Sequence, residues 1–201
     1  MTRFVFLNRP LMTLLAVLAL TGCSAMQAQN PASALRPVNA VADETDARVM
    51  LGGHDVVAYF TLGRHMLGDR RHSSRHEDVT FRFASAEHKA LFDADPKRYL
   101  PMYGGYCANG IAYGIPWGGD ADTWQMIDGR LYIFGGRGSM EAFLLDPAAN
   151  LALAEKYWAE EVRGSHSFWQ RAKRLVIRVP HYKTGEELAR EVAAAKARRG
   201  S

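Results

Sequence analysis

The stretch Arg98-Tyr-Leu-Pro-Met-Tyr-Gly-Gly-Tyr-Cys-Ala-Asn-Gly-Ile-Ala-Tyr-Gly114 holds four tyrosines, four glycines and one of the two cysteines of the chain. Glycine permits turns and close backbone approaches that other residues do not. Tyrosine adds a large apolar surface with a hydroxyl that needs a partner when buried. The stretch is too rich in glycine for a helix and too aromatic for a flexible linker. We expect a compact, ordered loop or loop–strand unit that holds Cys107 on a rigid frame.

The residues before this stretch predict two strands and a helix. Residues 56–60 form a short apolar run of β-branched and aromatic residues, which predicts a buried strand. Residues 63–75 are polar and basic and predict an exposed loop. Residues 79–84 alternate apolar and polar side chains, the pattern of a half-buried strand. Ser85 is a suitable N-cap for a helix that ends near Asp95.

The residues after it predict a hairpin and further helices. Asp128-Gly129 separates two β-prone runs within residues 124–134 and predicts a two-residue turn. Asp95-Pro96 and Asp146-Pro147 each place a capping residue before a proline at the first helical position. An apolar stripe marks the second of these helices, at Leu151, Ala154, Trp158 and Val162. The sequence therefore predicts an α+β fold, a small antiparallel sheet with helices packed on one side.

The N-terminus has the pattern of an export signal. Arg3 and Arg9 precede a short apolar run at 11–20, which is shorter than the about 20 residues a membrane-spanning helix needs. The following Leu20-Thr-Gly-Cys23 resembles the lipobox of bacterial lipoproteins, which implies a signal peptide at 1–22 and acylation of Cys23. The alternative is an ordinary signal peptide cut elsewhere. With a tether at 23–48, the resemblance implies an exported protein anchored in the membrane of the cell envelope, on the periplasmic face of the outer membrane.

The net charge of +4 is unevenly distributed. Residues 163–201 hold ten Lys and Arg against three Glu, so the body of the protein is acidic and this C-terminal extension is basic. A capping box at Thr184–Glu187 predicts a helix through about Arg198. The basic residues near its end suit the helix dipole. Alternatives are contact with anionic lipids and folding back onto the acidic body. An acidic exported body does not favour nucleic-acid binding.

Three blocks of the sequence resemble proteins with a YHS domain. They are Gly53-His-Asp-Val-Val-Ala-Tyr-Phe60, Val79-Thr-Phe-Arg-Phe-Ala-Ser85 and Tyr99-Leu-Pro-Met-Tyr-Gly-Gly-Tyr-Cys-Ala108. The resemblance covers about 49–134 and implies a YHS-like domain at 49–162. This family is similar to small metal-site domains that carry cysteine, and metal binding is its usual suggested role.

The chain departs from the family pattern at three positions. His54 stands where the family usually has an aromatic residue, Val56 where it has proline, and Met102 where it often has glutamine. His76 matches a position where the family often has histidine. These departures bear on the metal prediction, because His54 and Met102 are among the side chains that could join a cysteine ligand.

The sharpest functional prediction is a transition-metal site on Cys107. Thiolate, thioether and imidazole ligands together favour copper or zinc. The partners we expect are His54, His76 and Met102, which lie in or just before the blocks that resemble the family and should converge on the core. No Cys-x-x-Cys pair is present, so a closed four-thiolate zinc site is excluded. The simpler interpretation is that Cys107 is a small buried core residue.

Two other functions stay open. The aromatic residues near Cys107 could line a metal-free pocket for a small molecule or a protein partner; the candidates are Tyr103, Tyr106, Tyr113, Trp117 and Trp124. A Cys-dependent enzyme would need Cys107 beside His76 or His54, and no catalytic motif surrounds this cysteine. The sequence therefore favours non-catalytic binding at the cell envelope, with copper before zinc as the expected ligand.

Overall fold

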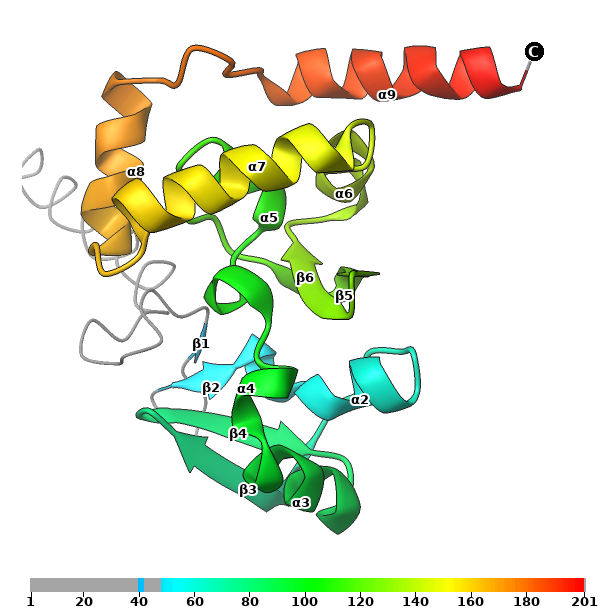
Figure 1. Ribbon diagram of the computed structural model, residues 1–201, viewed down its shortest axis with the longest axis vertical. Coiled ribbons are helices and arrows are strands. Elements are labelled where there is room, and N and C mark those ends of the chain that lie inside the picture. The colour runs from blue at the N-terminus through cyan, green and yellow to red at the C-terminus, as the bar shows by residue number, and fades with distance from the viewer. Residues whose placement is uncertain (1–39, 42–47, 201) are drawn as a thin grey trace, which may run out of the picture.

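The computed structural model describes residues 40–41 and 48–200, and its described strands form two small sheets (Figure 1). The first sheet has the order β1-β2-β4-β3 and contains β1 (Ala40–Val41), β2 (Val49–Met50), β3 (Asp69–His76) and β4 (Val79–Phe83). The second is the hairpin of β5 (Asp120–Ile127) and β6 (Arg130–Phe134). The pairings are antiparallel except that of β2 with β4. The predicted signal peptide, Cys23 and most of the tether lie outside the described residues.

Helices cover both sheets, which confirms the predicted α+β class (Figure 1). The helices of the first part are α2 (Val56–Thr61), α3 (Ala86–Ala94) and α4 (Pro96–Tyr99). Those of the second are α5 (Ala108–Ala112), α6 (Arg137–Phe143) and α7 (Pro147–Tyr157), with a π-helical turn η4 (Trp158–Val162). The C-terminal extension contributes α8 (Ser167–Val176) and α9 (Gly185–Arg199). Short 3-10 turns, η2 (Leu51–Gly53) and η3 (Met102–Gly105), precede α2 and α5.

The two hairpins are copies of one unit, displaced by 51 positions in the sequence. Asp69 pairs with Phe83, a bulge follows, and pairing resumes at Ser73. In the second hairpin Asp120 pairs with Phe134, and pairing resumes after a bulge at Trp124. Both hairpins close with a two-residue turn whose central residues have positive φ, as right-twisted hairpins favour. A bulge at the same place in both hairpins indicates an internal repeat.

The repeat extends to the segments before the hairpins. Leu51-Gly-Gly and Tyr103-Gly-Gly share three successive positive φ angles, which glycine adopts readily. Asp55 then caps α2 and Cys107 caps α5 through their side chains. The Asp55 amide donates to the Met66 carbonyl at 2.8 Å, and the Cys107 amide donates to the Trp117 carbonyl at 2.9 Å. Asp55 and Cys107 therefore occupy equivalent positions in the two repeats.

Two apolar cores support the repeats, and the first also takes in Leu131 and Ile133 of β6. The first is built on β2, β4, α2 and α3 and includes Phe81, Phe83 and Phe92. The second lies between β6, α5 and α7 and includes Phe134 and Phe143. The repeats are thus two packed units in one chain, and the C-terminal extension lies against the second (Figure 1).

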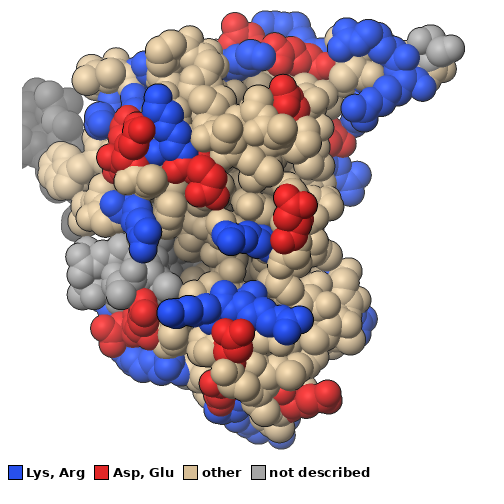
Figure 2. Space-filling view, viewed as in Figure 1, with Lys and Arg blue, Asp and Glu red and all other residues tan. Residues whose placement is uncertain are grey.

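The basic extension folds back onto the body, which was one of the alternatives open from the sequence. Lys173 and Arg174 of α8 both form ion pairs with Glu161. Lys196 of α9 forms an ion pair with Glu141 of α6 at 2.8 Å. Acidic and basic side chains are interleaved where α8 meets α7, while the basic C-terminal end of α9 projects beyond α6 (Figures 1 and 2).

Several local predictions are confirmed. Ser85 caps α3 by accepting from the His88 amide, and Asp146 caps α7 by accepting from the Ala149 amide. The hairpin around Asp128-Gly129 and the capping box at Thr184–Glu187 are both present. Asp95 precedes α4 as expected but makes no side-chain cap bond.

Three predictions are wrong. Residues 56–60 form α2 because the Asp55 carboxylate accepts from two amides of the first turn. Residues 69–75 of the expected loop belong to β3, a polar strand that pairs with β4. The Gly/Tyr stretch, expected to be too rich in glycine for a helix, contains the short helix α5. In each case a cap or a long-range partner overrides the local propensity.

Candidate functional site

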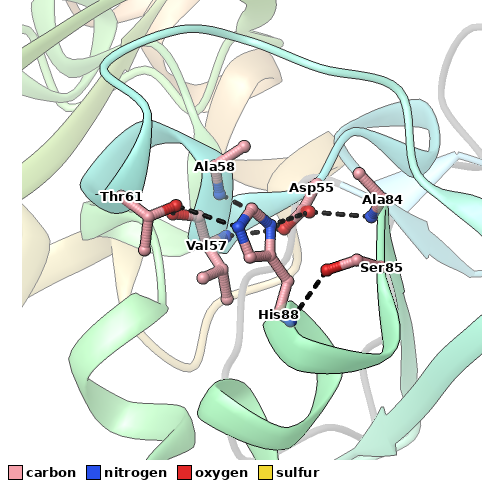
Figure 3. A network of polar contacts seen from close by, with 7 residues as sticks. All are labelled: Asp55, Val57, Ala58, Thr61, Ala84, Ser85 and His88. Atoms are coloured by element: carbon pink, nitrogen blue, oxygen red, sulfur yellow. Dashed lines mark hydrogen bonds and ion pairs between the residues drawn. The ribbon is translucent and has the colours of Figure 1, made fainter.

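In the first repeat, the capping position is filled by a buried polar network. The Asp55 side chain is fully buried and accepts from the amides of Val57 at 2.9 Å and Ala84 at 2.8 Å. The Nδ1 atom of His88 lies 2.6 Å from Asp55 Oδ2. His88 Nε2 lies 3.1 Å from the Thr61 hydroxyl, so the imidazole fills the space between them (Figure 3). This network joins α2 to α3 and leaves no space above the carboxylate.

In the second repeat, smaller groups occupy the same positions. Cys107 replaces Asp55, and Ser139, the third residue of α6, replaces His88, the third residue of α3. Cys107 Sγ lies 3.1 Å from Ser139 Oγ and accepts a long bond of 3.4 Å from the Gly110 amide. Exchanging imidazole for a hydroxymethyl group leaves room above the sulfur. A cavity of about 640 Å³ lies there, lined by both side chains.

The C-terminal extension forms the opposite wall of this cavity. Leu188 and Val192 of α9 face Tyr113 and Trp117 of the Gly/Tyr region across it, and most of the lining is apolar. A cavity of this size and character suits a small molecule, since such sites combine apolar walls with a few polar groups. The first repeat has no counterpart of α8 and α9, so only the second repeat builds this cavity.

Asn109 is the most informative polar group in the cavity. The residue is 5% exposed, and it lines the cavity two residues after Cys107. Within residues 40–41 and 48–200, its carboxamide has no hydrogen-bond partner. Among these residues the carboxamide atoms are not counted with the buried unpaired side-chain atoms, so they are open to the cavity. Asn109 therefore presents a free donor and a free acceptor to whatever occupies the cavity.

The remaining polar groups leave the cavity close to neutral. Lys196 is paired with Glu141, and Lys183 is paired with Glu191 at 2.6 Å. Burial raises the pKa of Tyr113, with smaller contributions from nearby Glu191 and Tyr182. The Tyr113 hydroxyl thus stays protonated at neutral pH and can donate. The cavity offers hydrogen bonds rather than an unpaired charge.

The aromatic residues proposed from the sequence fall into two groups. Tyr113 and Trp117 line the cavity. Tyr103 lies in the second core and donates to Glu155 at 3.1 Å, and Tyr106 is fully buried. Burial raises the pKa of the Tyr106 hydroxyl, which bonds to Ser167 of α8. Tyr103 and Tyr106 are therefore part of the frame, and they do not line this cavity.

The residues proposed as metal ligands lie in different places. His54 lines a separate hollow beside His65, and its Nδ1 donates to the Leu51 carbonyl at 2.9 Å. His76, at the end of β3, packs edge-on against Phe81 and Phe92. Met102 contacts Arg130, with 3.6 Å between Sδ and Nη1. None of the three lines the cavity at Cys107.

Among the described residues, no three His, Cys, Asp or Glu side chains are grouped so that they could hold a metal ion. Copper or zinc binding therefore stays a prediction from the sequence. Cys107 also has no imidazole among its hydrogen-bond partners in this part of the chain. The side chain beside its sulfur is Ser139, whereas a Cys–His nucleophile needs a histidine there.

Sequence reasoning missed Asn109, Ser139 and the wall from α9. Asn109 lies inside the quoted Gly/Tyr stretch, but nothing local distinguishes it from a turn residue. The usable signal was the repeat: aligning Ser85-Ala-Glu-His88 with the residues 51 positions later places Ser139 opposite His88.

None of the helices in the described ranges is both long and apolar enough to cross a membrane. Comparison of the chain with models of known protein families, with curated proteins and with solved structures found no match.

Proposed function

We propose that this chain is a binding module for a small, uncharged and largely apolar molecule, held in the cavity between α9 and the Cys107–Asn109 segment. The observation that carries the proposal is Asn109, whose carboxamide has no protein partner in the described residues and is open to a largely apolar cavity. A structural asparagine would have bonds to the protein, as Asn150 has to the Phe143 carbonyl at 2.9 Å. The missing bonds of Asn109 are those that a ligand would supply.

The cavity also supports a ligand class. A carboxamide offers a donor and an acceptor side by side, and it pairs with a planar edge that offers the complementary pair. Tyr113 and Trp117 provide aromatic surfaces on which a flat ring could pack. The paired lysines argue against a strongly anionic ligand. We therefore propose a planar aromatic or heteroaromatic molecule with an amide-like edge.

The proposal extends to the cellular setting predicted from the sequence. A YHS-like domain carried by an exported lipoprotein, acylated at Cys23, would present this cavity at the cell envelope. Mass spectrometry of the N-terminal peptide from the membrane fraction tests the anchor directly. A Cys23 peptide bearing acyl chains supports it, and an unmodified N-terminus elsewhere contradicts it.

Ligand binding is tested with the full chain and two matched variants. A panel of uncharged aromatic and heteroaromatic compounds is screened by thermal shift and by NMR. Asn109→Leu is expected to lose binding without loss of stability, because it removes polar atoms that have no protein partner. Asn150→Leu should show the reverse, since it breaks an existing bond but lies outside the cavity.

Two results would contradict the pocket. If no compound shifts the wild type, or if Asn109→Leu unfolds the protein as Asn150→Leu does, Asn109 is structural. The metal alternative has its own signature: about one equivalent of copper or zinc, lost in Cys107→Ser while the fold survives.

A further inference from the structure

Helix α8 buries its polar face and exposes its apolar face, the reverse of an ordinary surface helix. Its buried residues are Ser167, Gln170 and Arg174, spaced along one face. Its outward residues include Trp169, 68% exposed, and Val176, 85% exposed, which lie seven positions apart on one face. A helix at the surface normally buries its apolar stripe and exposes its polar one.

The buried polar face makes hydrogen bonds and an ion pair to the body. Gln170 donates to the Gly114 carbonyl at 2.9 Å and to Glu161 at 3.1 Å. Arg171 donates to the Pro116 carbonyl at 2.8 Å. The Arg174 guanidinium pairs with Glu161 and lies over the Tyr157 ring. These bonds fix the orientation of α8, so its apolar face cannot turn inward without breaking them.

The apolar face continues past the end of the helix. Leu175 is 77% exposed and Ile177 is 60% exposed, on either side of Val176. Together with Trp169 they form what we name the α8 patch. Exposed apolar groups scattered singly need no explanation, but a contiguous set on one element marks an interaction site.

The segment that carries the patch has an excess of basic residues. Residues 163–183 contain six Lys and Arg and no Asp or Glu. Glu161 pairs with two of them, Lys173 and Arg174, which leaves a positive surplus around the patch. A second copy of the same surface would be repelled by this charge. Tryptophan, aliphatic side chains and Lys or Arg on one surface are the composition of elements that lie in the interface of anionic membranes.

We propose that the α8 patch docks on an anionic phospholipid bilayer. Trp169 and the Leu175–Ile177 segment would enter the headgroup region, with Arg178 at the phosphates. This contact is independent of what the cavity binds. It would hold the domain in a fixed orientation on the membrane, because α8 is bonded rigidly to the body.

The test uses the full chain and vesicles of phosphatidylethanolamine with phosphatidylglycerol, compared with phosphatidylcholine alone. Binding is measured by flotation, and insertion by quenching of tryptophan fluorescence with brominated lipids. Replacing both Leu175→Asp and Val176→Asp is expected to weaken binding to anionic vesicles about tenfold or more, given the apolar area removed from the contact. All variants keep the same N-terminus, so the differences report α8 alone.

A tryptophan pair gives the matched control. Trp169→Phe should lose the quenching by brominated lipid, whereas Trp117→Phe, at a residue 43% exposed outside α8, should retain it. Added salt should weaken binding, because the charge contribution is screened. Equal quenching of the two variants, or equal flotation of the double variant and wild type, overturns the proposal. So does a wild-type dimer that Val176→Asp dissociates, since the patch would then be a self-association surface.

Discussion

Replacing Asp55 by alanine should destabilise the fold far more than the same change at its counterpart, Cys107. Asp55 accepts from the amides of Val57, Ala58 and Ala84 and contacts His88 Nδ1 at 2.6 Å. Loss of a helix cap costs about 1 kcal/mol. Each buried donor left unpaired costs about 1–3 kcal/mol before the structure relaxes. We expect a total of about 3–5 kcal/mol, as for other buried pairs that lose one partner.

Cys107→Ala should cost only about 1 kcal/mol, since a neutral hydrogen bond contributes little net free energy. The sulfur accepts one long bond from Gly110, at 3.4 Å, and contacts the Ser139 hydroxyl. Ser139 lines the cavity, where water can replace the lost partner of its hydroxyl. The difference between the two losses of unfolding free energy measures how much more the polar network of the first repeat contributes than the Cys107–Ser139 contact of the second.

The assay is urea unfolding of the full chain at neutral pH, followed by circular dichroism and tryptophan fluorescence. The free energies of unfolding are compared at equal slopes, so that only stability is scored. Asp55→Ala within about 1 kcal/mol of Cys107→Ala would refute the reasoning from the repeat, because the buried network would then contribute no more than one bond. A large loss for Cys107→Ala would show that this cysteine is a core residue.

Three further predictions concern the cavity and the extension. Ser139→His should place an imidazole where His88 lies in the first repeat, and so abolish ligand binding. It should also speed alkylation of Cys107, since a neighbouring imidazolium favours the thiolate. Unchanged binding and unchanged alkylation would contradict the equivalence of the repeats. Burial alone would raise the pKa of Glu161, but hydrogen bonds from Lys173 and Gln170 and the charge of Arg174 hold it below the ordinary 4.5. The stabilisation from the Glu161 carboxylate is therefore complete above pH 4.5 and is lost as the pH falls through the lower folded-state pKa. The difference in free energy of unfolding between wild type and Glu161→Gln should therefore become smaller in acid. Urea midpoints measured across this pH range test it. Lys196→Glu should loosen α9, measured as faster amide hydrogen exchange in residues 185–199 without change in the hairpins.

Local rules predicted the elements that are fixed by their own residues. Ser85, Asp146 and Thr184 each cap the helix that follows, and Asp128-Gly129 makes the turn that its φ angles require. These features depend on hydrogen bonds within four residues, so the sequence contains all the information needed.

Elements decided by distant partners could not be predicted in this way. The Val56–Phe60 run is β-branched and aromatic, yet Asp55 caps it and the Met66 carbonyl holds its start, so a helix forms. The β3 strand has no apolar alternation, because its outer face is exposed and its position depends on pairing with β4. Propensity describes the average environment of a residue and loses to such specific contacts.

The candidate site likewise contains some residues that the sequence predicted and others that depend on distant parts of the chain. Cys107, Tyr113 and Trp117 were found from the sequence because unusual residue types cluster in one short stretch. Ser139 and the wall of α9 were missed, since they lie 32 and about 80 positions away. Comparing the repeats would have identified Ser139, because it stands where the first repeat has a histidine that completes a network.

The second repeat differs from the first in two ways, and both differences lie at the cavity beside Cys107. The Asp55–His88 pair is replaced by Cys107 and Ser139, which opens space above the cap of α5. The chain then continues into α8 and α9, and α9 forms one wall of that space. Without α9 the space would be an open notch. With the Asp55–His88 pair kept, α9 would lie on a filled surface. The proposed binding of a small molecule rests on this combination of a vacated network, an added wall and the carboxamide of Asn109 between them.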